Sequence, residues 1–257
     1  MEEQVKLRLI EINNQFYQTF ASQFSTTRQR LQPGVQRILK LIPPEANVLD
    51  LGCGNGALMH ALILDGFRGR FIGIDSSSSL LQIANRDLQE IQALTMPVRP
   101  VFFQADLSDQ DWDISLCSYL PGFPSIKFDF ILAFAVLHHL PGWDLRLQTL
   151  IKINRLLATG GSFFHSEWQF LNSPRLRTRI QSWRLIGIQE KQVDQGDFLL
   201  DWRQGGNGLR YAHHFTFEEL SELAIGADFQ IVASFYSDGR EGNLAIYQTW
   251  QLNSIIG

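Results

Sequence analysis

Cysteine is scarce in this chain, and long apolar runs are absent. The two cysteines among 257 residues, Cys53 and Cys117, are too few for a disulfide framework or a four-cysteine metal site, which favours a reducing cytoplasm. The longest apolar stretches, such as Phe130 to Leu137, are far too short to span a bilayer. The N-terminal residues mix both charge signs in a helical apolar period and contain no secretory segment. We therefore expect a cytoplasmic protein without a membrane anchor.

Internal repeats, low-complexity linkers and a strong charge imbalance are also missing from the sequence. The net charge of −4 argues against nonspecific nucleic-acid binding by the whole surface, although it leaves local basic patches open. With 45% hydrophobic and 19% charged residues, the composition is that of an ordinary globular protein. We expect a single domain over residues 1–257.

Strand-like and helix-like segments alternate through most of the chain. The strand-like segments are residues 47–52, 70–75, 100–106, 128–137 and 162–168, and the helix-like segments are residues 57–66, 76–94 and 144–161. The strands are apolar throughout, which is typical of a parallel sheet covered on both faces. Residues 229–237 and 244–252 predict a terminal antiparallel hairpin. The fold class is therefore α/β, a mostly parallel seven-stranded sheet with helices on both faces and one antiparallel C-terminal strand.

Two further segments do not follow this alternation. Residues 1–44 predict a helical lid that Pro43 and Pro44 bring to an end. Residues 168–225, which become glycine-rich and aromatic in their second half, predict an insertion. Open α/β sheets bind ligands beyond the carboxyl ends of their strands, so we expect this insertion to lie over the active site there.

A glycine-rich turn follows the first strand. Gly52, Gly54 and Gly56 stand at alternate positions, and glycine accepts positive φ and lets a ligand approach the backbone closely. A strand, such a turn and a helix N-terminus together form a nucleotide-sized crevice. Gly52, Gly54 and Ala57 also match the dinucleotide pattern G-x-G-x-x-G/A, so a dinucleotide oxidoreductase is one alternative.

Three acids at the ends of neighbouring strands favour a different cofactor. Asp50, two residues before the first glycine, would repel a pyrophosphate but suits the cationic amino-acid tail of S-adenosylmethionine. Asp75 is placed to accept hydrogen bonds from ribose hydroxyls, and Asp106 from the adenine amine. Each acid alone also has a structural explanation as a turn or helix cap, but three at one sheet edge indicate a ligand site.

The segments VLDLGCGNG, IGID and QAD resemble the motifs of class I S-adenosylmethionine-dependent methyltransferases, over roughly residues 35–170 and the terminal hairpin. The resemblance implies their Rossmann-like fold and their cofactor, but it does not specify the methyl acceptor. The cofactor-binding residues that it implies are Asp50, Gly52, Cys53, Gly54, Asn55, Asp75, Ser76, Asp106, Leu107 and Ala133.

Further elements resemble the tRNA wobble-uridine 5-carboxymethyl methyltransferases. The matching residues are Phe24, Thr27 and Arg28; Leu137 to Leu140; Asp197, Asp201 and Trp202; and Arg210, Tyr211, His213 and Phe215. The tryptophan segment lacks the family's proline, and YAH replaces YYH. The resemblance implies methyl transfer to a tRNA carboxylate, with Arg28 and Arg210 as clamps and Tyr17, His138 and Tyr211 shaping the pocket. Eukaryotic members need a small partner subunit, so a small activator subunit is a candidate partner.

Esterification of a carboxylate suits arginines, because the nucleophile is already ionised and a planar guanidinium fixes its geometry. The pairs His138–His139 and His213–His214 lack the acids or cysteines that would complete a metal site, and we expect no metal.

An acid-free basic stretch, residues 168–189, predicts a phosphate-binding patch, although a solvated helix face explains it equally. Its arginines are Arg175, Arg177, Arg179 and Arg184. The alternatives to a tRNA methyltransferase are a small-molecule O- or N-methyltransferase and a non-catalytic cofactor-binding partner protein.

Overall fold

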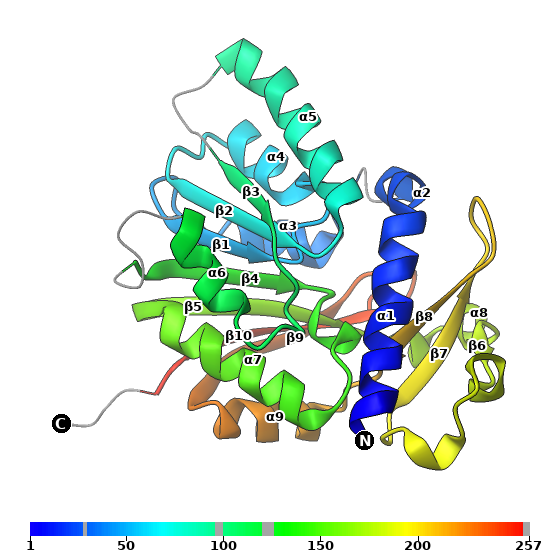
Figure 1. Ribbon diagram of the computed structural model, residues 1–257. Coiled ribbons are helices and arrows are strands. Elements are labelled where there is room, and N and C mark those ends of the chain that lie inside the picture. The colour runs from blue at the N-terminus through cyan, green and yellow to red at the C-terminus, as the bar shows by residue number, and fades with distance from the viewer. Residues whose placement is uncertain (28–29, 96–99, 120–125, 254–257) are drawn as a thin grey trace.

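A seven-stranded sheet forms the centre of the computed structural model, which describes residues 1–27, 30–95, 100–119 and 126–253 (Figure 1). Its strand order is β3-β2-β1-β4-β5-β10-β9. The strands are β1 (Asn47–Leu51), β2 (Arg70–Asp75), β3 (Val101–Gln104), β4 (Phe128–Phe134), β5 (Leu157–Trp168), β9 (Phe229–Ser237) and β10 (Ala245–Leu252). Strands β1 to β5 pair in parallel, whereas β10 is antiparallel to both β5 and β9. The predicted fold class is confirmed.

Helices cover both faces of this sheet. One face carries α3 (Pro33–Leu39), α4 (Ala57–Leu64) and α5 (Ser78–Thr95), and the other carries α6 (Trp112–Tyr119), α7 (Trp143–Leu156) and α9 (Phe217–Gly226) (Figure 1). Successive residues of a strand point to opposite faces. In β1, Leu49 and Leu51 therefore pack in the core under α7 and α9, while Val48 packs in the core under α4 and α5. Because both faces are buried, the strands need apolar residues at almost every position.

The boundary between α7 and β5 differs from the prediction. The sequence predicts a helix through the glycines at 160–161, but α7 ends at Leu156 and β5 begins at once. The pairing of β4 with β5 shifts where Phe128 opposes Leu157 and Phe130 opposes Ser162. A side chain on Gly161 would lie 2.8 Å from the Asp129 carbonyl oxygen. The glycines therefore allow a register irregularity in β5, where its backbone comes close to that of β4.

Helices α1 (Glu3–Thr19) and α2 (Ala21–Thr27) and the insertion lie together at one edge of the molecule, whereas α3, which the predicted lid 1–44 includes, packs on the main sheet (Figure 1). Helix α1 lies between the main sheet and a small antiparallel sheet, and α2 follows it (Figure 1). The small sheet has the order β6 (Ile180–Gln181), β7 (Asp197–Trp202), β8 (Gly208–His213), preceded by the short helix α8 (Pro174–Arg177). Leu9 of α1 packs on Leu199 and Tyr211 of this sheet. None of the helices in the described ranges is both long and apolar enough to cross a membrane.

The insertion is shorter than the predicted range 168–225. Helix α9 starts at Phe217, and its Leu220 and Leu223 are buried in the main core with α7. The last nine residues of the predicted insertion therefore belong to the main layer of helices rather than to the added small sheet.

Candidate active site

A cavity opens at the carboxyl ends of β1 to β4, beneath α1. Its wall includes the turn after β1, the end of β2, the loop after β3 and the turn η1 (Leu137–His139) after β4. Of the predicted cofactor residues, those on the cavity wall are Asp50, Gly52, Cys53, Gly54, Asn55, Asp75, Ser76, Asp106 and Leu107. The sheet thus brings together side chains from four separate strand ends.

The glycines of the first turn are required by the backbone conformation. Gly52 has φ +68° and Gly56 has φ +75°, in the left-handed region that other residues avoid. A side chain on Gly52 would also lie 2.7 Å from Val136 of the turn after β4. The N–H of Gly54 donates to Asp75 Oδ2 at 2.9 Å, so the turn is tied to the end of β2.

Asp50 and Asp75 lie side by side on this wall. Asp75 accepts the N–H groups of Gly54 and Ser77, and burial raises its pKa to about 6 despite these donors. Burial, and then the charge of Asp75, raises the pKa of Asp50 well above its ordinary value. Asp50 Oδ2 is buried and has no hydrogen-bond partner among the described residues. A cationic donor in the cavity, such as the ammonium of S-adenosylmethionine, would stabilise a buried carboxylate oxygen in this state.

Asp106 lies at the β3 end of the cavity. Its Oδ1 accepts the N–H and the hydroxyl of Ser108 at 2.9 and 2.7 Å, and its Oδ2 accepts Asn14 Nδ2 of α1 at 2.9 Å. Nearby, Asn55 donates to Ser25 of α2 at 2.9 Å. Helices α1 and α2 therefore contact the cavity wall directly.

Ala133 does not lie on the cavity wall. Its side chain is fully buried in the core beneath α7, and the residue that lines the cavity is Ala135, two positions later. Ala135 has φ +59°, and its N–H donates to the Ser166 carbonyl at 2.9 Å. The chain bends away from β4 at this point, and Ala135 rather than Ala133 therefore lies against the cavity.

His138 lies on the cavity wall and is held from behind by a buried acid. Its Nδ1 is 2.8 Å from Glu167 Oε2, and its backbone N–H donates to the same oxygen at 3.1 Å. The other carboxylate oxygen is 3.1 Å from His165 Nδ1. Burial raises the pKa of Glu167 well above its ordinary value and lowers that of His165 to about 3. Glu167 was not singled out from the sequence, although an acid within a strand predicted to be buried on both faces indicates a buried polar partner.

Arg210 of β8 also lies on the cavity wall. Its guanidinium carbon is 4.6 Å from the ring centre of Trp168, 5.5 Å from that of Phe16 and 5.7 Å from that of Trp202. The side chain is only 8% exposed. Three rings from α1, β5 and β7 thus fix the faces of the guanidinium, while its N–H donors lie in the plane between them.

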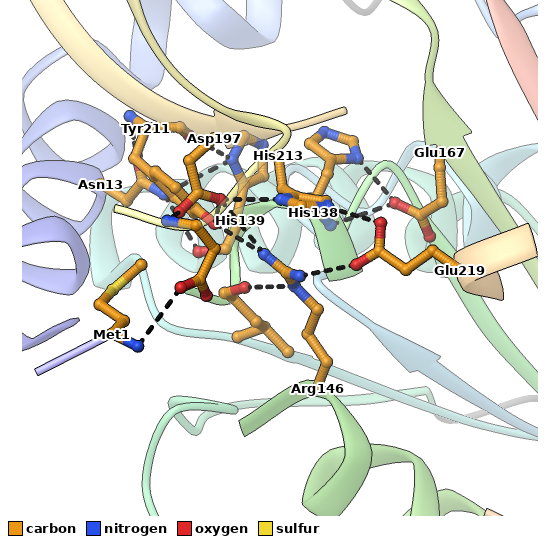
Figure 2. Close-up of polar contacts among 12 residues, drawn as sticks. Met1, Asn13, His138, His139, Arg146, Glu167, Asp197, Tyr211, His213 and Glu219 are labelled. Carbon is orange, nitrogen blue, oxygen red and sulfur yellow. Dashed lines mark hydrogen bonds and ion pairs between the residues drawn. The ribbon is translucent and has the colours of Figure 1, made fainter. Parts of the chain in front are cut away.

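Tyr211 does not shape the acceptor pocket, contrary to the prediction. Its side chain is fully buried, its hydroxyl donates to Asp197 Oδ1 at 2.7 Å, and Arg146 Nη2 donates to that hydroxyl at 2.8 Å (Figure 2). His213 bridges Asp197 and Glu219 at 2.7 and 2.8 Å. Successive residues of β8 point to opposite sides, so Arg210 faces the cavity and Tyr211 faces this network.

Arg146 and several hydrogen-bond donors stabilise the negative charge of Asp197 in this buried network. Burial alone would raise the pKa of Asp197, but hydrogen bonds from His213 and Tyr211 and the charge of Arg146 outweigh it and lower the pKa. Arg146 of α7 also donates to the Leu140 carbonyl at 2.9 Å and to Glu219 at 3.1 Å. Asp197 and His213, which the tRNA-family resemblance also matched, therefore hold β7 and β8 to α7 and α9.

Arg28 lies outside the described residues, while its neighbour Phe24 lines the cavity. In the basic stretch, Arg175, Arg177 and Arg184 are exposed, whereas Arg179 Nη1 is 3.3 Å from Asp201. Among the described residues, no group of three histidine, cysteine, aspartate or glutamate side chains is arranged to hold a metal ion.

The doubly covered sheet, the glycine turn and the three acids define an S-adenosylmethionine-dependent methyltransferase of class I, with S-adenosylmethionine as its cofactor. A family described as a methyltransferase domain matches residues 24–234, and the chain belongs to this family.

Curated relatives include several tRNA methyltransferases. The mouse tRNA (carboxymethyluridine(34)-5-O)-methyltransferase ALKBH8 is 27% identical over 187 residues, 72% of this chain and 23% of that protein. The Schizosaccharomyces pombe tRNA (carboxymethyluridine(34)-5-O)-methyltransferase is 29% identical over 158 residues, 62% of this chain and 58% of that protein. The chain thus spans less than two thirds of either relative. Trans-aconitate 2-methyltransferase of Acidovorax ebreus is 28% identical over 146 residues, 56% of this chain and 45% of that protein.

Solved structures share the fold at low identity. A S-adenosylmethionine-dependent methyltransferase from Methanosarcina mazei superimposes with a TM-score of 0.64 at 22% identity, over 87% of this chain and 99% of that chain.

Proposed function

We propose that this methyltransferase esterifies a carboxylate, and that its acceptor is the carboxymethyl group of a modified wobble uridine in tRNA. The observation that carries the proposal is the position of Arg210, a guanidinium enclosed by aromatic rings on the wall of the cofactor cavity. The names of the mouse and fission-yeast relatives supply the particular acceptor.

The chemistry of such a transfer asks little of the protein beyond alignment. When bound, the cofactor supplies an electrophilic methyl group on a positively charged sulfur. A carboxylate is already ionised near neutral pH, so no side chain has to remove a proton before the carbon–oxygen bond forms. Arg210 orients the carboxylate through paired donors, and the ring contacts keep the guanidinium from turning.

The exposed arginines of the insertion support an RNA acceptor. Arg175 and Arg177 lie on α8 and Arg184 follows shortly after, in the segment that adjoins the small sheet. In a chain of net charge −4, three exposed arginines without a neighbouring acid form a local positive surface. Phosphate groups bind such surfaces by releasing counterions, which makes binding depend strongly on salt.

A small-molecule acid is the second candidate acceptor, and the resemblance to a trans-aconitate methyltransferase favours it. Both candidates present a carboxylate to Arg210, but only the tRNA needs the arginines of the insertion. The two candidate functions therefore share the same reaction and differ only in the molecule that accepts the methyl group.

The decisive experiment is single-turnover transfer from radiolabelled S-adenosylmethionine to tRNA carrying 5-carboxymethyluridine at the wobble position. A matched tRNA lacking the carboxylate, an RNase-treated sample and a pool of small carboxylic acids are the controls. We expect label only in the carboxylate-bearing tRNA, released by mild alkali as an ester should be. Label in the small acids alone would replace the tRNA proposal. Activity of the purified chain by itself would show that no activator subunit is needed.

A further inference from the structure

Helix α1 contacts the ends of three strands around the cavity. Asn14 donates to Asp106 at the β3 end, and Gln18 donates to Ser78, just after β2, at 3.1 Å. Asn13 donates to the His139 carbonyl in the turn after β4 at 3.2 Å. The face of α1 that carries these amides therefore lies across the full width of the cofactor site.

Tyr17, on the same helix, forms a short contact with His139. Its hydroxyl oxygen is 2.7 Å from His139 Nε2, and both residues line the cavity. The other ring nitrogen of His139, Nδ1, is 3.1 Å from the carbonyl oxygen of Tyr211. The two nitrogens of one imidazole are thus bound to groups from two different elements, α1 and β8.

The carbonyl oxygen of Tyr211 determines which nitrogen of His139 carries the proton, and therefore which way the Tyr17 hydroxyl points its own. A carbonyl only accepts, so Nδ1 carries the proton of the neutral ring and Nε2 is the acceptor. Tyr17 therefore donates its hydroxyl proton to Nε2. The amide of Asn13 is 3.5 Å from Nδ1, a weaker contact than its bond to the His139 carbonyl, and it does not change this assignment.

This assignment fixes what Tyr17 offers to the cavity. Its proton is held by His139, so towards a ligand its oxygen acts as a hydrogen-bond acceptor and not as a donor. A phenol oxygen that donates strongly on one side becomes a better acceptor on the other, because linked hydrogen bonds polarise one another. The site thus presents a partial negative charge at the β4 end of the cavity.

The order of the strands indicates where the charged end of a bound cofactor would lie. Asp106 and Asp75 lie at the ends of β3 and β2, where adenine and ribose are expected, and Asp50 lies on β1, where the ammonium is expected. In the sheet order β3-β2-β1-β4, the sulfur end of a cofactor held in this way lies over β1 and β4. The turn after β4 carries His139, and Tyr17 is bound to it.

We propose that Tyr17, its proton held by His139, recognises the positively charged methylsulfonium of S-adenosylmethionine. The C–H groups of a methyl on a sulfonium are electropositive and attract an acceptor oxygen, whereas the neutral thioether of S-adenosylhomocysteine has neither the methyl nor the charge. The pair therefore distinguishes the substrate cofactor from its product and favours exchange after turnover. This inference concerns the cofactor alone and holds whichever acceptor is methylated.

The test is a comparison of two dissociation constants, which needs no methyl acceptor. Titration calorimetry at about pH 8 would measure the binding of S-adenosylmethionine and of S-adenosylhomocysteine to the parent and to Tyr17→Phe. We expect Tyr17→Phe to raise the dissociation constant of S-adenosylmethionine about two- to fivefold and to leave that of S-adenosylhomocysteine unchanged. Equal weakening of both ligands, or no change in either, would overturn the proposal.

His139→Phe tests the role of the histidine. This substitution removes the acceptor for the Tyr17 proton, so the hydroxyl can turn its proton to the cavity. We therefore expect the variant to lose the preference for S-adenosylmethionine over S-adenosylhomocysteine, as Tyr17→Phe does. The double variant should then be no worse than either single variant. An unchanged preference in His139→Phe would overturn the assignment of the proton. Tyr236→Phe, an exposed tyrosine of β9, is the matched control and should change neither constant.

Discussion

At the scale of single residues, we expect the titration of Asp75 to affect cofactor binding. Burial raises its pKa to about 6, and its oxygens accept the N–H groups of Gly54 and Ser77. If Asp75 holds the ribose as we propose, the ionised carboxylate would accept the ribose hydroxyls better than the protonated acid. We expect affinity for S-adenosylmethionine to fall about tenfold between pH 7 and pH 5. Calorimetry across this range is the measurement, and Asp75→Asn should bind more weakly at pH 7 and show a flatter profile. An equally steep profile in that variant would assign the titration to another group.

The same shift affects the stability of the cofactor-free protein. The folded pKa lies above the ordinary value of 3.8, so the folded state binds more protons than the unfolded state between about pH 4 and pH 6. The contribution of Asp75 to the free energy of unfolding therefore falls as pH rises through this window. In urea titrations, the free energy of unfolding of Asp75→Asn should increase relative to that of the parent as pH rises from 4 to 7.

Arg210 is the residue whose replacement separates acceptor binding from cofactor binding. Lysine keeps the positive charge but loses both the planar fork and the stacking on Trp168. We expect Arg210→Lys to lower kcat/KM for the carboxylate-bearing tRNA by tenfold or more while the dissociation constant of the cofactor stays the same. Arg240→Lys, at a residue whose side chain is 97% exposed, is the control. A fully active Arg210→Lys would contradict the carboxylate acceptor and leave the methyltransferase assignment intact.

At the scale of elements, Arg146 joins α7 to the small sheet and to α9. It bonds the Leu140 carbonyl, Tyr211 and Glu219, and its side chain is almost fully buried (Figure 2). Arg146→Met would leave the buried Asp197 and the partly exposed Glu219 without their arginine. We expect a loss of about 3–5 kcal/mol in the free energy of unfolding, measured by urea denaturation.

The exposed Arg86→Met is the matched control for Arg146→Met. The Arg86 side chain is 66% exposed and pairs only with the adjacent Asp87 among the ion pairs of the described residues. We therefore expect the free energy of unfolding to change by no more than about 0.5 kcal/mol. A similarly small loss in Arg146→Met would mean that the network contributes little to holding the insertion on the main domain.

At the scale of the whole molecule, the distribution of arginines leads to a test of the proposed RNA binding. Replacing Arg175, Arg177 and Arg184 by glutamine removes the exposed charges of the insertion, whereas Arg179 is left because it pairs with Asp201. Each lost phosphate contact should lower the slope of log affinity against log salt by about 0.7–0.9. Filter binding of tRNA at several salt concentrations measures this slope, and cofactor affinity should not change.

The control for this triple variant lies at the opposite edge of the sheet. Arg68, Arg70 and Arg155 are exposed near the amino ends of β2 and β5, away from the cavity. Their replacement by glutamine changes net charge by the same amount. A loss of salt dependence as large as in the insertion variant would show that tRNA responds to total charge and not to this surface.

The sequence alone determined the sheet and the placement of three acids at one edge of it, because both depend on short-range patterns. Asp50, Asp75 and Asp106 each follow an apolar strand closely, and parallel strands bring their carboxyl ends to one edge whatever the remaining packing. The glycines of the first turn were predictable for the same reason, since positive φ is a local property. The glycines of β5 were misread because an α-helix C-terminus and a strand irregularity use the same residue.

Only the tertiary structure decided which side chains face each other across the cavity. Tyr17 and His139 are 122 positions apart, and the rings around Arg210 come from three elements. The family pattern placed Arg210 and Tyr211 together at the acceptor, but alternation along β8 sends one to the cavity and the other into the Arg146 network. Side-chain neighbours of this kind depend on how α1 and the small sheet pack on the main sheet. That packing is a sum of many weak contacts between distant segments, and no local pattern of residues encodes it.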